Sequence, residues 1–300
     1  MSDATDTWVV EAHHDVFENR EFPFTERDFR KIATMVYEDA GISLSNVKAP
    51  LVYSRLVKRL RALGVENFKR YCALVEGGEG MVERHQMIDA ITTNVTRFFR
   101  EPHHFEHLKT KVLPHLIANV RRGARLRIWS AGCSSGEEPY SIALTVLSLM
   151  PEAPQHDVRI LATDISRNML EKGRAGIYNE ATIAPVSRQM RSDWFQRERK
   201  PDGSKLWHVG EELRRLVAFR ELNLMDEWPM RQAYHIIFCR NVTIYFEEDV
   251  QTQIINRLAA RLAPGGHLYI GHSERVAHCD HRLLLDGNTV YRLARGETHA

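Results

Sequence analysis

The sequence predicts an α/β fold built on a doubly wound, Rossmann-like sheet, with an all-helical domain before it. From about residue 125, short apolar runs typical of buried strands alternate with amphipathic segments typical of helices. Such alternation favours a parallel sheet with helices on both faces. The last two apolar runs instead flank an Asp-Gly pair, which predicts an antiparallel hairpin at the C-terminal end.

The N-terminal third of the sequence is helical in pattern and contains no strand signal. We expect a flexible N-terminal arm over residues 1–24, a helical domain over 25–90 and the α/β domain over 91–300. The apolar runs predicted as strands are LRIWSA, DVRILATD, LVAFRELNL, YHIIFCR and GHLYIGHS, followed by the hairpin HRLLLDGNTVYRLA.

Residues 188–216 fit this alternation poorly. Within them, WFQRER and KLWHV flank KPDG, a plausible turn, so we expect a small β insertion on the main sheet. An insertion at such a point is more often a device for recognising a partner than a part of the core.

Composition narrows the classes of function. Apolar residues make up 43% and charged residues 27% of the chain, as in ordinary globular proteins. No apolar run reaches the roughly 18 to 20 residues that span a bilayer, and no secretory signal is evident, so we expect no membrane insertion and a cytoplasmic protein. Four isolated cysteines argue for reduced thiols, and the net charge of +2 implies no global attraction to nucleic acid.

Charge is nevertheless concentrated locally in residues 48–70, which carry seven bases and one acid, Glu66. The helix expected over 49–64 has Val52, Leu56, Leu60 and Leu63 on one face, with Arg55, Lys58 and Arg59 opposite and Arg61 beside them. Acids at i,i+4 that usually balance an exposed helix are missing from this face, which favours an acidic partner. A solvated polar face is the plain alternative. Nucleic acid is a further one, although aromatic residues are not interleaved there.

The segment AGCSSGEEP, residues 131–139, predicts a ligand-binding turn between the first strand and the next helix. Gly132 and Gly136 permit tight bends, but Glu137 and Glu138 would repel a pyrophosphate at the helix start. A cationic ligand without phosphate, such as S-adenosylmethionine, fits better. Asp164, at the end of the second strand, could accept hydrogen bonds from ribose hydroxyls. The alternative is that the two glutamates only cap the helix.

Six blocks then occur in order: TTNVTRFFRE, WSAGCSSGEEPYSIA, ATDIS with LEKGRAGIY, FRELNLMDEWP, IIFCRNVTIYF and LAPGGHLYIGHSE. Together the sequence resembles the chemotaxis receptor glutamate methyltransferase (CheR) family over about residues 25–290. The resemblance implies an S-adenosylmethionine methyltransferase sheet, methyl esterification of receptor glutamates, and glutamate-bearing receptor helices as partners of the helical domain.

The resemblance also implies roles for single residues. The cofactor site would contain Asn94, Thr96, Arg100, Glu137, Asp164, Asn223, Leu224, Arg240 and Asn241. Arg100 and Tyr245 match the positions closest to the reacting groups. The glutamate-bearing receptor helices supply the acidic partner that the basic face favours, so we predict that Arg55, Arg59 and Arg61 dock the receptor. No metal is implied, so His103, His104 and His107 are expected to be structural.

The chemistry implied by the resemblance needs no general base, because a glutamate with a pKa near 4.3 is ionised at neutral pH. Family members that tether to a receptor C-terminal pentapeptide carry a glycine triplet in the β insertion, whereas this chain has only Gly203 there. We therefore expect a pentapeptide-independent, monomeric enzyme. The alternatives are a methyltransferase acting on RNA or a small molecule, a dehydrogenase, and a non-catalytic module that senses the cofactor.

Overall fold

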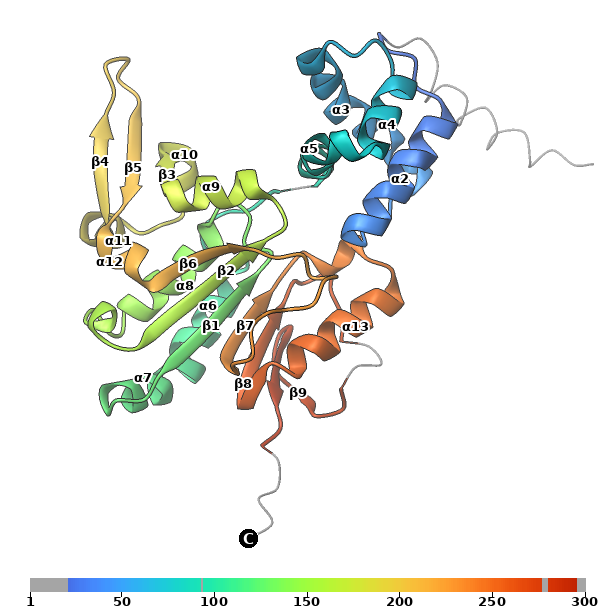
Figure 1. Cartoon of the computed structure of the whole chain (residues 1–300). Coiled ribbons are helices and arrows are strands. Elements are labelled where there is room, and N and C mark those ends of the chain that lie inside the picture. The colour runs from blue at the N-terminus through green and yellow to red at the C-terminus, as the bar shows by residue number, and fades with distance from the viewer. Residues whose placement is uncertain (1–20, 93, 277–279, 296–300) are drawn as a thin grey trace, which may run out of the picture. The chain divides into compact units, whose positions relative to one another are not determined.

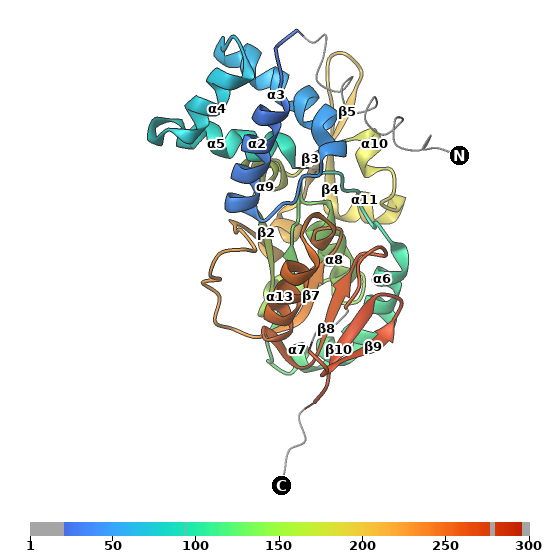
Figure 2. The ribbon, with the colours of Figure 1, turned by 90° about the vertical axis from the view of Figure 1, so that its right-hand side faces the viewer.

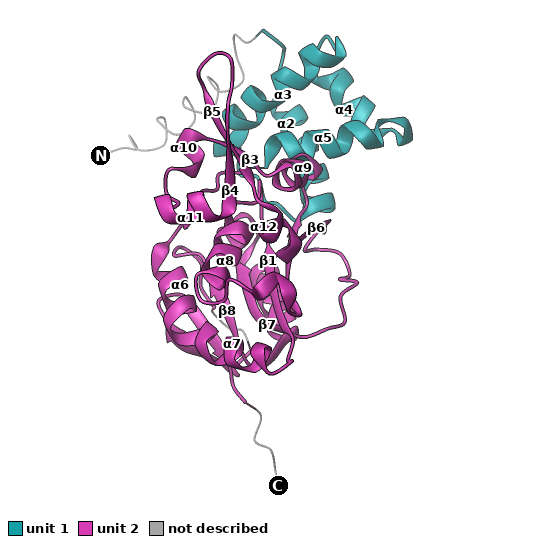
Figure 3. Cartoon of the chain, turned by 90° about the vertical axis from the view of Figure 1, so that its left-hand side faces the viewer, with its two compact units in different colours: residues 1–93 teal, residues 94–300 magenta. Residues whose placement is uncertain are grey.

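The computed structural model describes residues 21–92, 94–276 and 280–295. The chain divides into two compact units, residues 1–93 and 94–300 (Figure 3). The boundary between them follows residue 93, whereas the sequence predicted it after residue 90. The N-terminal arm expected over 1–24 lies mostly outside the described residues.

The first unit is built from helices whose ends carry clear sequence signals. Thr25 and Asp28 form a capping box at the start of α2, and the left-handed glycines Gly41 and Gly64 follow α2 and α3. Its elements are α2 (Glu26–Ala40), η1 (Asn46–Lys48), α3 (Ala49–Leu63), α4 (Phe68–Glu76), η2 (Gly78–Gly80) and α5 (Met81–Ile91). An aromatic cluster closes the core, with the Phe24 ring 4.4 Å from that of Phe68.

The second unit contains a seven-stranded sheet, seen near its edge in Figure 1. In sheet order the strands are β6 (Val217–Glu221), β2 (Val158–Asp164), β1 (Leu126–Ala131), β7 (Tyr234–Cys239), β8 (Leu262–Ile270), β10 (Val290–Leu293) and β9 (Leu283–Gly287). The first five are parallel, and β10 is antiparallel to both β8 and β9. This arrangement confirms the predicted parallel sheet and its C-terminal hairpin.

Both faces of the sheet are covered, as the continuous apolar strands predicted. Along β1, Leu126 and Ile128 belong to the core beneath α7 and α8, whereas Trp129 and Ala131 belong to the core beneath α13. Figure 2 shows α13 over β7 and β8. The helical segments of this unit are α6 (Pro102–His107), η3 (Leu108–Val112), α7 (Leu113–Arg121), α8 (Glu137–Leu147), η4 (Ala153–Gln155), α9 (Arg167–Ala175), α10 (Glu180–Ile183), α11 (Arg188–Trp194), α12 (Glu211–Leu216), η5 (Thr243–Tyr245) and α13 (Glu248–Ala259).

The predicted β insertion is a hairpin of β4 (Phe195–Arg199) and β5 (Lys205–Val209), which extends away from the main sheet (Figure 1). A third strand, β3 (Ile177–Asn179), pairs with β5 and completes a small second sheet. Three residues are too few to show a strand period, so the sequence did not predict β3. Among the described residues, no helix has the length and apolar character required to span a membrane.

Candidate active site

Four sequence-predicted residues lie at one edge of the main sheet. Glu137, Asp164, Asn223 and Asn241 follow or end β1, β2, β6 and β7, and these strands are parallel. β1 lies between β2 and β7, where the strand order reverses, and ligands of open α/β sheets bind at that point. The structure therefore brings these side chains to the edge expected of a cofactor site.

The glycine turn after β1 is tightly specified. Gly132, Ser134 and Gly136 have φ of 81°, 48° and 97°, and the N–H groups of residues 132 and 133 donate to the Thr163 carbonyl. A Cβ at Gly132 would lie 2.3 Å from Cγ2 of Val242, so only glycine fits against the turn that follows β7. Gly132 thus lets two loops of the site approach each other closely.

Glu137 begins α8 and its side chain is buried, with 5% of the residue exposed. Its Oε2 accepts a hydrogen bond of 2.8 Å from the Ser135 hydroxyl. Burial raises the pKa of this carboxyl above its usual value. A buried carboxylate at this position favours a cationic ligand that would compensate its charge.

Glu138 does not cap α8 through its backbone N–H groups; its carboxylate accepts from two other side chains. Its Oε2 accepts from Nε of Arg240 at 2.8 Å, and its Oε1 accepts from the Ser130 hydroxyl at 2.7 Å. Arg240 is 5% exposed and also donates to the Arg100 carbonyl at 2.6 Å and to Nδ1 of His104 at 3.0 Å. Arg240 was expected at the cofactor itself, but its guanidinium is enclosed by protein groups and supports the loop that carries Arg100.

Asp164 closes β2 and braces the glycine turn. One carboxylate oxygen accepts from the Ser134 N–H at 2.7 Å and the other from the Ser166 N–H at 2.9 Å. A carboxylate that backbone N–H groups fix at this strand end is suited to receive ribose hydroxyls.

The segment that carries Asn94, Thr96 and Arg100 is held in an unusual conformation. Phe99 and Glu101, on either side of Arg100, have φ of 52° and 57°. The Phe99 N–H donates to the Ser141 hydroxyl at 2.9 Å, and the Asn94 carbonyl accepts from the Ser134 hydroxyl at 3.0 Å. The Arg100 guanidinium donates to the Val95 carbonyl at 3.0 Å and is partly exposed. These contacts fix the backbone around an arginine that solvent can reach.

Asn223 and Leu224 follow β6, and the sequence did not identify the residue that holds them. Arg257 of α13 stacks over Trp228, with its guanidinium carbon 4.2 Å from the ring centroid, and donates to the Leu224 carbonyl at 2.7 Å. A charged residue inside an amphipathic helix gives no sequence signal of such a long-range contact.

Tyr245, predicted near the reacting groups, is half-buried at the end of η5.

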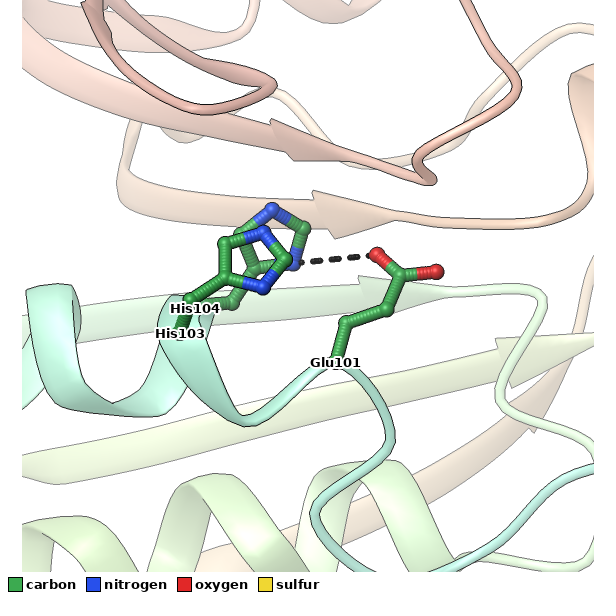
Figure 4. Close-up of side chains that lie close together, drawn as sticks. All are labelled: Glu101, His103 and His104. Carbon is green, nitrogen blue, oxygen red and sulfur yellow. Dashed lines mark ion pairs between the residues drawn. The ribbon is translucent and has the colours of Figure 1, made fainter.

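Glu101, His103 and His104 lie close enough together to suggest a metal site (Figure 4). Burial and the neighbouring Arg240 lower the pKa of His104 to about 3, so this imidazole is neutral. The Arg240 guanidinium donates to His104 and lies 3.6 Å from Oε2 of Glu101. This fixed cation already supplies the positive charge that a metal would bring, which favours the expected structural role.

In the first unit, α3 shows where the prediction of an unbalanced basic face was wrong. Arg59 makes a two-pronged ion pair with Glu83 of α5, and Arg61 pairs with Glu21. Arg55 donates to the Ile91 and Thr92 carbonyls. The balancing acids come from other segments, which i,i+4 spacing could not reveal. Leu63, expected on the apolar face, is 42% exposed because it ends the helix.

Comparisons with known proteins agree with this geometry. Residues 94–291 match the CheR methyltransferase, SAM binding domain, and residues 27–92 match the CheR methyltransferase, all-alpha domain. The chain belongs to the CheR methyltransferase family. It is 51% identical to a probable chemotaxis protein methyltransferase of Rhizobium etli, over 86% of this chain and 96% of that protein. It is 39% identical to the chemotaxis protein methyltransferase of Escherichia coli, over 90% of this chain and 92% of that protein.

As a member of the CheR family, the chain is an S-adenosylmethionine-dependent chemotaxis methyltransferase, of the protein-glutamate O-methyltransferase type. The site fits that cofactor. Glu137 is a buried carboxylate suited to an ammonium group, and the acidic start of α8 disfavours the phosphates of a dinucleotide. The dehydrogenase alternative is therefore excluded.

Proposed function

We propose that the chain transfers the methyl group of S-adenosylmethionine to glutamate side chains on cytoplasmic helices of methyl-accepting chemoreceptors. The products are glutamate 5-O-methyl esters and S-adenosylhomocysteine, and the reaction serves sensory adaptation in chemotaxis. The observation that carries the proposal is the buried Glu137 carboxylate beside the glycine turn, with Asp164 on the neighbouring strand. The names of the relatives support the chemotactic substrate.

In this proposal the cofactor is held by groups from each loop at the strand ends. Glu137 binds its ammonium, Asp164 its ribose, and Asn223 and Leu224 border its adenine. Asn94, Thr96 and Asn241 close the site around it. Arg240 supports the site indirectly, by donating hydrogen bonds to the Arg100 carbonyl and to Glu138.

When bound, S-adenosylmethionine supplies a methyl group activated by a positively charged sulfur. The attacking carboxylate is already ionised at neutral pH, so the protein needs to orient it rather than deprotonate it. Arg100 attracts and aligns the substrate carboxylate, and the Tyr245 hydroxyl donates a weaker, neutral hydrogen bond that leaves an oxygen lone pair free to attack. Orientation of this kind can lower a barrier by roughly 7 to 11 kcal/mol.

Receptor recognition is assigned to the exposed side of α3, through Arg55, Arg59 and Arg61. Lys58 lies on the same side and is exposed. The ion pairs to Glu83 and Glu21 reduce the net charge of this surface, so an acidic receptor helix would have to compete with them. Charge reversal at Arg55 and Arg61 should weaken receptor methylation and its salt dependence without changing cofactor affinity. Unchanged methylation and salt response would remove this surface from the proposal.

The β insertion favours an enzyme that does not tether to a receptor pentapeptide. The turn between β4 and β5 has one glycine, Gly203 with φ of 81°, where tethering members carry three. A peptide with the tethering sequence should therefore show no measurable affinity, and a clear binding isotherm would contradict this assignment. We further propose that the enzyme is cytoplasmic and that it is a monomer. Sedimentation at working concentration checks the monomeric state.

One assay tests the main proposal. The protein is incubated with methyl-labelled S-adenosylmethionine and receptor-rich membranes, and the labelled bands are treated with mild alkali. Volatile methanol from a receptor band is the expected result, because carboxyl esters hydrolyse in base. Label that resists alkali, or that appears in RNA or small molecules, would support the alternative methyltransferases. Cofactor binding without any transfer would support a non-catalytic sensor.

A further inference from the structure

The segment GHSE, residues 271–274, follows β8 and has no assigned part in the reaction. Glu274 is only 4% exposed, yet five donors converge on its carboxylate at 2.5 to 2.9 Å. These donors are the N–H groups of Asn241, Val242, Thr243 and Gly271 and the hydroxyl of Thr243. Successive backbone N–H groups form an anion-binding concavity, and here a side chain of the same protein fills it.

This carboxylate holds the turn that follows β7. Asn241 has φ of 59°, a conformation that asparagine tolerates better than most residues but that surrounding contacts must maintain. Oε2 of Glu274 accepts from the Asn241 N–H, while Oε1 accepts from the next two N–H groups. The same turn presents Val242 to Gly132 and leads directly into η5, which ends at Tyr245.

A second carboxylate approaches Asn241 through its side chain. Nδ2 of Asn241 lies 3.3 Å from Oε1 of Glu101, and Nδ1 of His272 lies 3.2 Å from that oxygen. Glu101 is the neighbour of Arg100 in sequence and is also 3.6 Å from the Arg240 guanidinium. Asn241 is thus fixed at its backbone by Glu274 and at its amide by Glu101.

Gly271 provides the space for these contacts. A Cβ there would lie 2.5 Å from Nδ2 of Asn241, and 2.8 Å from both its backbone N and Oε2 of Glu274. The glycine is therefore required by close approach, since its own φ is not in the left-handed region.

We propose that Gly271 and Glu274 form a positioning element for the reaction, resting on the proposed function of the site. The Glu274 carboxylate is enclosed by donors of the protein itself. It fixes the turn that carries Asn241 and Tyr245 and, through Asn241 and Glu101, aligns that turn with the segment carrying Arg100. The cofactor-facing and substrate-facing loops are aligned through two carboxylates, those of the buried Glu274 and the half-buried Glu101.

The decisive variant is Glu274→Gln. Oε1 of Glu274 accepts from three donors and Oε2 from two, so either orientation of a glutamine amide turns its NH2 group toward backbone N–H donors. If the amide oxygen takes the place of Oε1, the N–H groups of Asn241 and Gly271 lose their acceptor. We expect the Kd for S-adenosylhomocysteine to rise about 3- to 10-fold and kcat for receptor methylation to fall at least about 10-fold. The KM for receptor should stay within about twofold, because α3 is untouched.

The control is Leu126→Ala, a destabilising change in a fully buried residue at the opposite end of β1. Measured at a temperature where both variants are folded, it should leave Kd and kcat near those of the wild type. If Glu274→Gln and Leu126→Ala had equal Kd values for S-adenosylhomocysteine and equal kcat values for receptor methylation, the proposal would be overturned. If Glu274→Gln does not fold, Thr243→Val, which removes one donor to the same carboxylate, should lower kcat about 3- to 10-fold. Wild-type turnover of folded Thr243→Val would likewise overturn it.

Calorimetric binding of S-adenosylhomocysteine needs no receptor, so its outcome is independent of the methylation assay. A wild type that binds the nucleoside but forms no base-labile receptor ester would contradict the proposed substrate. In that case a weaker Kd for Glu274→Gln would still support the positioning element.

Discussion

Replacing Glu137 by glutamine should improve the stability of the free protein while weakening its affinity for the cofactor. The buried carboxylate has its pKa raised by burial, so the folded state holds its proton more tightly than the unfolded state does. Stability therefore falls as pH rises through that raised pKa, and at pH 7 the ionised group destabilises the free protein. A neutral amide of the same size removes this penalty.

The cost of the change appears on binding. A hydrogen bond to a charged group contributes about 1.5 to 3 kcal/mol, which corresponds to an affinity loss of about 10- to 150-fold when the ammonium loses its carboxylate. At a fixed excess of ligand, a 100-fold weaker Kd removes about 2.7 kcal/mol of ligand-induced stabilisation. Titration calorimetry with S-adenosylhomocysteine and thermal unfolding with and without ligand measure both effects.

Glu138→Gln is the matched control, because the neighbouring glutamate has the opposite role. Removing one partner of the buried pair with Arg240 should destabilise the free protein by about 3 to 5 kcal/mol. The two variants thus predict opposite changes in melting temperature. If Glu137→Gln binds S-adenosylhomocysteine as the wild type does, Glu137 is not the ammonium ligand and the reasoning fails.

Other predictions concern the remaining parts of the site. Arg100→Ala should lower kcat about 100- to 1,000-fold, as loss of a charge-stabilising donor does elsewhere; near-normal turnover and cofactor affinity would remove Arg100 from the reaction. Gly132→Ala should weaken S-adenosylhomocysteine binding because its Cβ would meet Val242 at 2.3 Å, and a second change, Val242→Ala, should restore part of the loss. Because the pKa of buried His104 is about 3 against 6.5 when exposed, the unfolded state binds more protons between these values. Stability should therefore fall with decreasing pH by up to about 1.4 kcal/mol per pH unit, and His104→Gln should flatten this slope relative to exposed His115→Gln.

The main sheet could be predicted from the sequence because buried parallel strands are continuously apolar. The hairpin could be predicted because Asp286 and Gly287 indicate a nearby reversal, although both end β9 and the turn itself is Asn288 and Thr289. For the candidate site, the sequence predicted that Glu137 follows the first strand and that Asp164 ends the second, and the structure places them there, while their cofactor contacts stay a prediction. What the sequence did not show are contacts between distant segments: Glu101 with Asn241, and Arg59 with Glu83. These pairs depend on how the elements pack, which neither spacing nor charge pattern encodes locally.

The pairing of Glu138 with Arg240 also constrains how this site can change during evolution. The two residues are 102 positions apart. Glu138 would become an uncompensated buried charge if Arg240 were replaced alone, and Arg240 would lose the nearer of its two carboxylate partners if Glu138 were. A lineage would therefore have to alter both together, or pass through a poorly folding intermediate. Among natural variants, these two positions are expected to be inherited as a unit, and a chain that keeps one without the other should carry a substitute charge nearby.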